Sequence, residues 1–280
     1  MATIEAFAPA KINLALHVTG QRADGYHLLD SLVVFADIGD RITVTPSDGL
    51  SLSVDGPMAE GVPADDSNLV MKAAQWLDSG KGAEITLTKV LPASSGIGGG
   101  STDAAATLRA LSELWGCPLP TANEALPLGA DLPVCMKART QRMSGIGEVL
   151  DDVPKLPPLE ILLVNPGVLV STPAVFRALP RRDNPAMADK LPGWADAGAF
   201  ADWLKDQRND MQAAAVSLEP VIGDVLEALQ GTGCLYAGMS GSGATCFALF
   251  EADGVSAQKA RAAVSAAHPQ WWCASGQVLR

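Results

Sequence analysis

The sequence lacks several features that would point to whole classes of function. No stretch of its 280 residues approaches the ~20 apolar residues that a membrane helix needs. Lysine and arginine total 20 against 31 aspartates and glutamates, so the net charge is −11, and basic clusters are missing. Because nucleic-acid binding draws its affinity from phosphate neutralisation, we expect neither a membrane nor a nucleic acid as partner.

Cysteine and histidine are also scarce. The five cysteines show no CxxC spacing, and the three histidines form no metal-ligand pattern, so no metal site is assigned. We interpret the cysteines as mostly buried small hydrophobes in a reducing compartment. The N-terminal stretch carries Glu5 and Lys11, so it lacks the unbroken apolar core of a signal peptide. We expect a soluble, cytoplasmic protein.

The chain alternates strand and helix patterns over a length natural for two domains. From Ile4 to Val18 every even position is apolar, which predicts a strand, or a bent strand pair, with one buried face. Lys11, Asn13 and His17 would share the other face. Further strands are expected at 31–35, 41–45, 50–54, 84–91, 160–164, 244–250 and 271–278. Helices are expected at 68–77 (capped by Asp65, Asp66 or Ser67), 101–115, 199–206, 210–218, 220–229 and 256–267.

These patterns favour an α+β protein. The segment VPKLPP (153–158) looks like a domain boundary, which gives domains at residues 1–152 and 153–280. Residues 180–197, with several prolines and charges, are expected to form an exposed loop without an assigned role.

The most informative segment is PASSGIGGGSTDAAA (92–106), which follows a predicted strand and opens a predicted helix. The first N–H groups of a helix lack internal partners and carry partial positive charge, so such a segment suits an anion. Glycines let the backbone approach a phosphate, and Ser101 and Thr102 add hydroxyls for the phosphate or its Mg²⁺. A tight structural turn is the alternative. The Walker A, GxGxxG and protein-kinase patterns are missing, so phosphate binding would follow another scheme.

This segment closely resembles the central motif of the GHMP kinases, which include galactokinase, homoserine kinase and mevalonate kinase. Three further segments match in order: PAKINLALHVTGQRADGYHLLDSL (9–32), LGADLPV (128–134) and GMSGSGATCFALF (238–250). The first of these is most similar to the branch that acts on 4-diphosphocytidyl-2-C-methyl-D-erythritol in the non-mevalonate isoprenoid pathway. The resemblance implies a two-domain α+β fold, with a ribosomal-protein-like N-terminal domain and a ferredoxin-like C-terminal domain.

The family moves the γ-phosphoryl group of ATP to a substrate hydroxyl, which requires positioning, charge stabilisation and a carboxylate to take the proton. The resemblance makes Asp131 that base. It also implies that Lys11 pairs with Asp131, keeps it ionised and lowers the pKa of the hydroxyl. From the residues alone, Asp131 could equally bond nearby loop N–H groups, and Lys11 could point outward from an edge strand.

The resemblance also implies binding residues. For ATP these are Pro92, Gly96, Ile97, Gly98, Gly99, Gly100, Ser101, Thr102, Asn68 and Lys89. For the second substrate they are Asn13, Tyr26, His27, Thr172, Phe176 and Gly241. Tyr26 offers a flat face to a pyrimidine and His27 a donor and an acceptor to its polar edge, although DGYH could be a plain turn with Tyr26 packed. Mg²⁺ is expected to come with ATP, without a dedicated protein site.

We therefore predict an ATP-dependent kinase for the 2-hydroxyl of 4-diphosphocytidyl-2-C-methyl-D-erythritol, a monomer or weak homodimer. Two alternatives remain: a GHMP kinase for another small alcohol, such as homoserine or mevalonate, and a non-catalytic nucleotide-binding regulator. Tyr26 and His27 argue against the first, because a small aliphatic substrate needs no aromatic platform. The presence of both Lys11 and Asp131 argues against the second.

Overall fold

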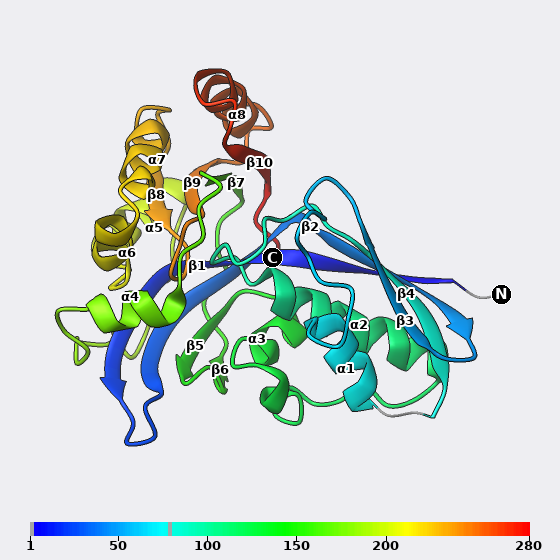
Figure 1. Ribbon diagram of the computed structural model, residues 1–280. Coiled ribbons are helices and arrows are strands. Elements are labelled where there is room, and N and C mark those ends of the chain that lie inside the picture. The colour runs from blue at the N-terminus through cyan, green and yellow to red at the C-terminus, as the bar shows by residue number, and fades with distance from the viewer. Residues whose placement is uncertain (1–2, 78–79) are drawn as a thin grey trace. The chain divides into compact units, whose positions relative to one another are not determined.

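The computed structural model describes residues 3–77 and 80–280, which form two compact units (Figure 1). Each unit is built from several separate segments. The first takes the chain up to Lys11, then Gly39–Ala93 and Gly98–Ala138; the second takes Ile12–Ile38, Ser94–Ile97 and Arg139–Arg280. The long strands β1 (Ile4–Gln21) and β2 (His27–Ser47) therefore contribute to both units. A division of domains between residues 152 and 153 stays a prediction.

The first unit contains one part of a six-stranded sheet, in which β1 pairs with β2, and the helix that begins at the glycine segment. Its strand β3 runs parallel to β4, and β4 runs antiparallel to the second half of β2. Helices α1 and α2 pack against each other (Figure 1), and their apolar side chains share a buried core with those of the strands. The bounds are β3 (Leu50–Asp55), α1 (Leu69–Leu77), β4 (Gly82–Thr88), α2 (Gly99–Trp115), the 3-10 helix η1 (Leu126–Leu128) and α3 (Leu132–Lys137).

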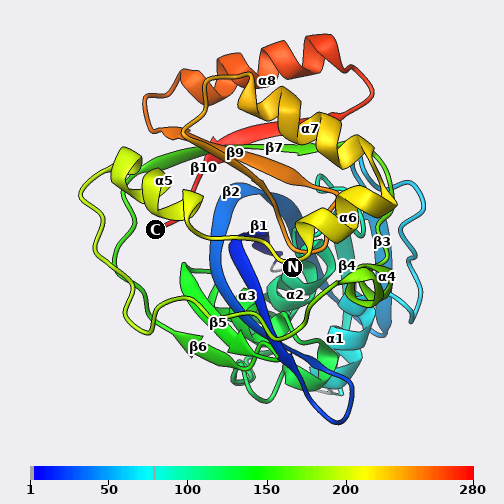
Figure 2. The same cartoon turned by 90° about the vertical axis from the view of Figure 1, so that its left-hand side faces the viewer.

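The second unit contains a four-stranded antiparallel sheet in the order β10–β7–β9–β8. Helices α7 and α8 cover one of its faces (Figure 2). The chain order is β7, helices, β8, β9, α8 and β10, which together with the strand order is a ferredoxin-like β-α-β-β-α-β arrangement. The bounds are β7 (Leu159–Asn165), α7 (Val221–Gln230), β8 (Tyr236–Met239), β9 (Cys246–Glu251), α8 (Ser256–Ala267) and β10 (Trp272–Gln277). The ferredoxin-like domain is thereby confirmed.

The remaining elements of the second unit were not all predicted. Strand β5 pairs with the first half of β2 and with β6, in antiparallel fashion. The bounds are β5 (Gln141–Gly145), β6 (Val149–Asp151), α4 (Thr172–Ala178), α5 (Ala197–Lys205) and α6 (Gln212–Leu218). The strands β5, β6 and β8, the helix α4 and, in the first unit, the helix α3 were not predicted. They are three to seven residues long and show few repeats of any period, although β3, β7, β9 and α6, of six or seven residues, were found.

Two expectations for the long strands were wrong. The strands expected at 31–35 and 41–45 are parts of the single strand β2. Gly39 between them does not mark a turn: a Cβ there would lie 2.2 Å from the carbonyl oxygen of Ala8, so this glycine permits a close approach of two backbones. In β1 the polar face is buried as well, because Lys11, Asn13 and His17 are all inaccessible to solvent.

The proline-rich segment 180–197 is irregular, as predicted, but it is not simply exposed. Met187 and Leu191 are buried, and the backbone N–H of Met187 donates to the Asp30 carboxylate at 2.7 Å. Arg142, which pairs with Asp30, donates to the carbonyl oxygens of residues 187–189. Side chains from distant strands therefore anchor this segment, which its composition did not indicate.

Within the described ranges, none of the helices combines the length and the apolar character needed to cross a bilayer. All five cysteines are free thiols. Cys135 and Cys246 are buried and the other three are half-buried, so the expectation of mostly buried cysteines holds for two of them.

Candidate active site

The glycine segment forms the turn that opens α2. The helix begins at Gly99, two residues before the predicted start, and Gly98 is its N-cap with φ of 66°. A Cβ on Gly98 would lie 2.9 Å from the Cβ of Lys11, so this close approach needs glycine and puts Lys11 beside the N-terminus of α2. The first turn of α2 carries no acidic side chain, and the N–H groups of Gly99, Gly100 and Ser101 precede the first helical hydrogen bond, which Thr102 N–H donates to the Gly98 carbonyl at 2.9 Å. This helix end is therefore suited to an anion.

Lys11 and Asp131 meet as the resemblance implied. The distance between Lys11 Nζ and Asp131 Oδ2 is 3.0 Å, and the side chains are 5% and 38% exposed, respectively. Asp131 occupies the N-cap position of α3, but its side chain makes no capping hydrogen bond there. Neither alternative describes the pair, since Lys11 is buried and Asp131 bonds a lysine instead of loop N–H groups. The result is an accessible carboxylate fixed by a buried ammonium group next to a helix end that is suited to an anion.

In the second unit, the third glycine motif packs against Gly96 of the glycine segment. Gly96 has φ of +77°, and a Cβ there would lie 2.5 Å from the carbonyl oxygen of Ser240. The Ser240 hydroxyl donates to the Gly96 carbonyl at 2.9 Å and accepts the Asn13 backbone N–H at 3.1 Å. Gly241, with φ of +57°, approaches Gly96 as well, because its Cβ would lie 2.9 Å from the Gly96 carbonyl oxygen. Ser240 thus connects two of the predicted site residues, although the sequence did not single it out.

The aromatic residues predicted to hold a pyrimidine also lie in the second unit. Tyr26 stands on the turn between β1 and β2 and is 57% exposed, so it is not simply packed. The His27 ring stacks on the Phe176 ring, with centroids 3.9 Å apart and planes 9° apart. Burial, reinforced by the positive charge of Arg182, lowers the pKa of His27 below its usual value. The structure therefore brings His27 and Phe176 together and leaves Tyr26 open.

The other two residues predicted for the second substrate are held by hydroxyl groups. Asn13 is buried, and its amide donates to the Ser31 hydroxyl at 2.7 Å. Thr172 is exposed at the start of α4, with its hydroxyl 2.7 Å from that of Ser242. Ser242 belongs to the third glycine motif, which is thus bonded to α4 as well.

Several residues that were predicted to bind ATP make hydrogen bonds to other parts of the protein. Asn68 caps α1, with its side-chain oxygen accepting the Val70 N–H at 2.9 Å; the sequence had suggested residues 65–67 for this role. The Thr102 hydroxyl donates to carbonyl oxygens of Gly98 and Gly99 at 3.2 and 3.0 Å, so it stabilises the first turn. Pro92 and Ile97 are buried, whereas Gly99 and Ser101 are half-exposed and Gly100 is exposed. Of the two predicted hydroxyls, the Ser101 hydroxyl is the more accessible.

Lys89 belongs to a buried ionic cluster. Its ammonium group donates to Asp40 and, at 2.9 Å, to Asp103. Asp40 also accepts the N–H groups of Val90 and Leu91 at 2.5 and 2.8 Å. The other Asp103 oxygen is buried and has no hydrogen-bond partner in the described parts of the chain. Burial raises the pKa of Asp103 to about 8 against the opposing effect of Lys89, so one carboxyl of the cluster takes up a proton readily.

The raised pKa of Asp103 makes stability depend on pH. Its folded-state pKa of about 8 exceeds the ordinary value of 3.8, so its contribution is fully present below about pH 4 and is lost as the pH rises through about 8. We expect the free energy of unfolding to fall by a few kcal/mol between about pH 5 and about pH 9. Asp103→Asn should remove most of this fall, as measured by urea unfolding across that range. An unchanged pH dependence in the variant would contradict the assignment.

Sequence reasoning missed Asp40 and Asp103 as partners of Lys89. Asp103 directly follows the Ser-Thr pair of the glycine segment, so its place in the motif was the available signal; Asp40 had none. Among the residues that the structure describes, no three His, Cys, Asp or Glu side chains are placed to hold a metal ion. A hydroxyl such as that of Ser101 can join a metal that phosphates already hold.

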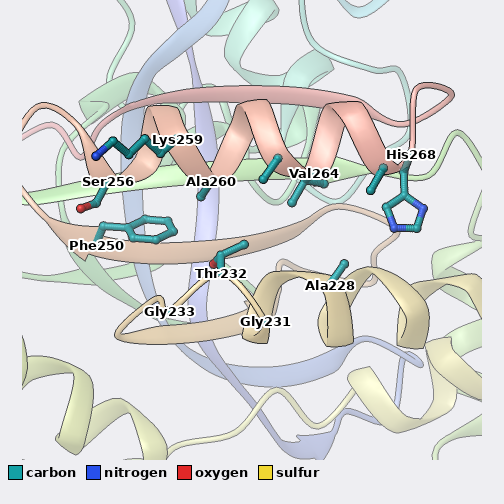
Figure 3. A pocket seen from close by; sticks show the side chains of 12 residues that line it. Ala228, Gly231, Thr232, Gly233, Phe250, Ser256, Lys259, Ala260, Val264 and His268 are labelled. Carbon is teal, nitrogen blue, oxygen red and sulfur yellow. The ribbon is translucent and has the colours of Figure 1, made fainter.

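The second unit also contains a cavity of about 560 Å³ between α7, the turn after it and α8 (Figure 3). Alanines and glycines provide half of its lining, and Lys259 and His268 stand toward its two ends. None of the predicted site residues lines this cavity. It is therefore separate from the candidate site.

Known proteins resemble this chain over nearly its whole length. Residues 68–147 match the model of the GHMP kinases N-terminal domain, and residues 187–270 match that of the GHMP kinases C-terminal region. The 4-diphosphocytidyl-2-C-methyl-D-erythritol kinase of Ruegeria pomeroyi is 61% identical over 99% of both chains. The enzyme of that name from Cereibacter sphaeroides is 57% identical over 96% of both.

Solved structures agree with these relatives. A crystal structure of 4-(cytidine 5'-diphospho)-2C-methyl-D-erythritol kinase matches with a TM-score of 0.78 and 32% identity, over 98% of this chain and 99% of its own. The homoserine kinase of Cytophaga hutchinsonii shares the fold, with a TM-score of 0.65 and 20% identity over 99% and 95% of the two chains. The chain thus has the two-domain fold of the GHMP kinases, and it belongs to that family and, within it, to the 4-diphosphocytidyl-2-C-methyl-D-erythritol kinases.

Proposed function

We propose that this chain phosphorylates the 2-hydroxyl of 4-diphosphocytidyl-2-C-methyl-D-erythritol with ATP, in the cytoplasm, in the non-mevalonate pathway to isoprenoid precursors. The observation that carries the chemistry is the ion pair of Lys11 with Asp131 beside the N-terminus of α2. The substrate follows from the relatives of that name, which are 61% and 57% identical to the chain.

The residues of the first unit have distinct tasks in this reaction. The N-terminus of α2 binds the negatively charged phosphates of ATP through its backbone N–H groups. Asp131 accepts the proton of the substrate hydroxyl while that oxygen forms its bond to the γ-phosphorus and the bond from the γ-phosphorus to ADP breaks. Lys11 holds the Asp131 carboxylate in place and stabilises the negative charge that develops on the attacking oxygen.

The residues of the second unit select the second substrate. Tyr26 and Phe176 offer faces to the pyrimidine, and His27 offers hydrogen bonds to its edge. Asn13, Thr172 and Gly241 are assigned to the rest of the substrate. Support for this assignment comes from the stacked His27 and Phe176 rings and from the exposed ring of Tyr26.

Mg²⁺ belongs to this reaction as the ion that accompanies ATP. It supplies charge neutralisation of the phosphates when bound. The Ser101 hydroxyl at the start of α2 is the protein group that we assign to it, together with water and the phosphates themselves. We infer that the working molecule is a monomer or a weak homodimer.

The proposal is tested by a coupled assay of ADP release with MgATP and three alcohols in parallel: diphosphocytidyl-methylerythritol, homoserine and mevalonate. We expect turnover with the cytidylated substrate alone. Turnover with another alcohol alone would support the roles proposed for Lys11 and Asp131 and would show that the substrate is that alcohol instead. ATP binding without turnover of any alcohol would favour a non-catalytic regulator.

A further inference from the structure

Arg182 lies in the irregular segment 180–197, to which the sequence assigns no role. Its guanidinium donates to the carbonyl oxygen of Phe176 through Nε at 3.3 Å and Nη2 at 3.1 Å. Nη2 also donates to the carbonyl oxygen of Arg177 at 3.3 Å. These carbonyls belong to the last turn of α4, where that of Phe176 also accepts the N–H of the C-cap residue Leu179 at 3.4 Å and where a cation is favourable. Arg182 therefore fixes the end of the helix that carries Phe176.

The Phe176 side chain in turn contacts the side chain of His27. Its ring lies flat on the Phe176 ring, and its Nε2 atom is buried without a hydrogen-bond partner among the described residues. A buried polar atom without a hydrogen-bond partner is unfavourable in free energy, and a ligand that forms this hydrogen bond removes the penalty. The stacked imidazole thus has unused hydrogen-bonding capacity at a place assigned to substrate.

Arg182 also acts on His27 through its charge. Burial has the larger effect in lowering the pKa of His27, and the positive charge of Arg182 lowers it further. On the His27 turn, Asp24 is paired with Arg22 at 2.7 Å, and on α4 the charged residue is Arg177. Arg182 is accordingly the charge that disfavours the imidazolium form of this ring.

We propose that Arg182 is a positioning residue for pyrimidine recognition, which holds the backbone of Phe176 and keeps a fixed positive charge at the end of the helix whose Phe176 ring stacks on His27. This inference rests on the proposed function, because it concerns the cytidine end of that substrate. Arg182 itself need not touch the substrate.

The chemistry of a cytosine ring explains why this arrangement matters. The edge of cytosine presents an amino group, which donates, beside a ring nitrogen, which accepts. A neutral imidazole has one donor and one acceptor and can match either group, whereas an imidazolium has two donors and cannot accept from the amino group. Keeping His27 neutral therefore preserves cytosine recognition at mildly acidic pH.

Steady-state kinetics of Arg182→Met against pH test the inference. We expect KM for the cytidylated substrate to rise by about tenfold, with KM for ATP unchanged and kcat within about twofold, the equivalent of one lost positioning contact. The acidic limb of kcat/KM should move to higher pH, because removing the positive charge makes His27 easier to protonate. Arg182→Lys keeps the charge and loses the paired hydrogen bonds. It should therefore raise KM for the cytidylated substrate without moving the acidic limb of kcat/KM.

Arg181→Met is the matched control. Arg181 is the preceding residue and is exposed, and it pairs with Asp183 at 2.8 Å, so its loss should leave KM and the limb unchanged. When His27 is replaced as well, in the double variant His27→Asn with Arg182→Met, the acidic limb of kcat/KM should stay where it is in His27→Asn alone. A histidine NMR titration gives a readout without turnover: the His27 signal, identified by its loss in His27→Asn, should titrate at higher pH in Arg182→Met.

The outcomes separate the two proposals. If the wild-type chain turns over the cytidylated substrate and Arg182→Met behaves like Arg181→Met in both KM and titration, the inference is overturned and the proposed function stands. If the wild-type chain binds ATP but does not turn over that substrate, the proposed function fails, and the inference fails with it.

Discussion

Asp131→Asn is expected to lower kcat by at least about 100-fold, a loss of about 2.7 kcal/mol or more of transition-state stabilisation. The amide keeps the size of the carboxylate but cannot take the proton of the attacking hydroxyl. It also cannot form the ion pair that Lys11 makes at 3.0 Å. The measurement is ADP release at saturating ATP and cytidylated substrate, compared with wild type. Asp131 is partly exposed and does not cap α3 with its side chain, and the amide oxygen of asparagine can still accept a hydrogen bond from the buried Lys11, so the variant should still fold, which a melting curve checks.

Lys11→Ala is the companion variant. It should also lose kcat, because the carboxylate is no longer held and the charge on the attacking oxygen is no longer stabilised. Residues that act as a unit give non-additive losses, so the double variant should be little worse than Asp131→Asn alone. Wild-type turnover in a correctly folded Asp131→Asn protein would remove Asp131 from the role of base.

The ion pair of Lys11 and Asp131 could be anticipated from sequence because both residues lie in recognisable motifs. The alternation from Ile4 to Val18 indicated the strand that carries Lys11, and LGADLPV resembled the segment that carries the aspartate. The distance of 3.0 Å between them then confirmed that the two segments, 120 residues apart, meet. What the period of two could not reveal is that the polar side of β1 is buried too, since that depends on what packs against it.

The ionic cluster shows where the sequence falls short. The resemblance implied that Lys89 binds ATP, and the structure gives its ammonium group two carboxylate partners. Asp40 and Asp103 are 49 and 14 residues away from Lys89, and no local pattern marks a buried charge that a distant residue neutralises. Burial of charge is decided by tertiary packing, which a single sequence does not contain.

The segment 180–197 illustrates the same limit for a loop. Its prolines and charges predicted an irregular path, which is what the structure has. The contacts of Arg182 with α4 were not predictable, because a guanidinium that bonds backbone carbonyls leaves no sequence pattern at the carbonyl end. The motifs therefore led to the residues proposed to touch substrate, and the structure was needed to find those that hold them in place.

Lys89→Met is expected to lower the free energy of unfolding by about 3–5 kcal/mol near neutral pH, the usual effect of removing one partner from a buried ionic group. Asp40 and Asp103 would remain buried without their ammonium partner. The pKa of Asp103, which burial already raises, should rise further, so the folded state would bind protons more readily, and the loss should be smaller at about pH 5 than at about pH 8. Urea unfolding at both pH values measures this. Lys89→Met combined with Asp103→Asn should recover part of the loss.

The matched control is Lys205→Met. Lys205 pairs with Asp202 at 2.8 Å on the surface of α5, and both side chains are exposed, so the same chemical change should cost less than about 1 kcal/mol. If Lys89→Met were as stable as this control and instead lost only affinity for ATP, Lys89 would be a phosphate ligand, as its place in the sequence predicts. If Lys89→Met is destabilised by several kcal/mol, the Lys89 ammonium group stabilises the fold by neutralising the two buried carboxylates. These lie beneath the start of α2, where a Cβ on Gly99 would lie 3.1 Å from Lys89 Nζ.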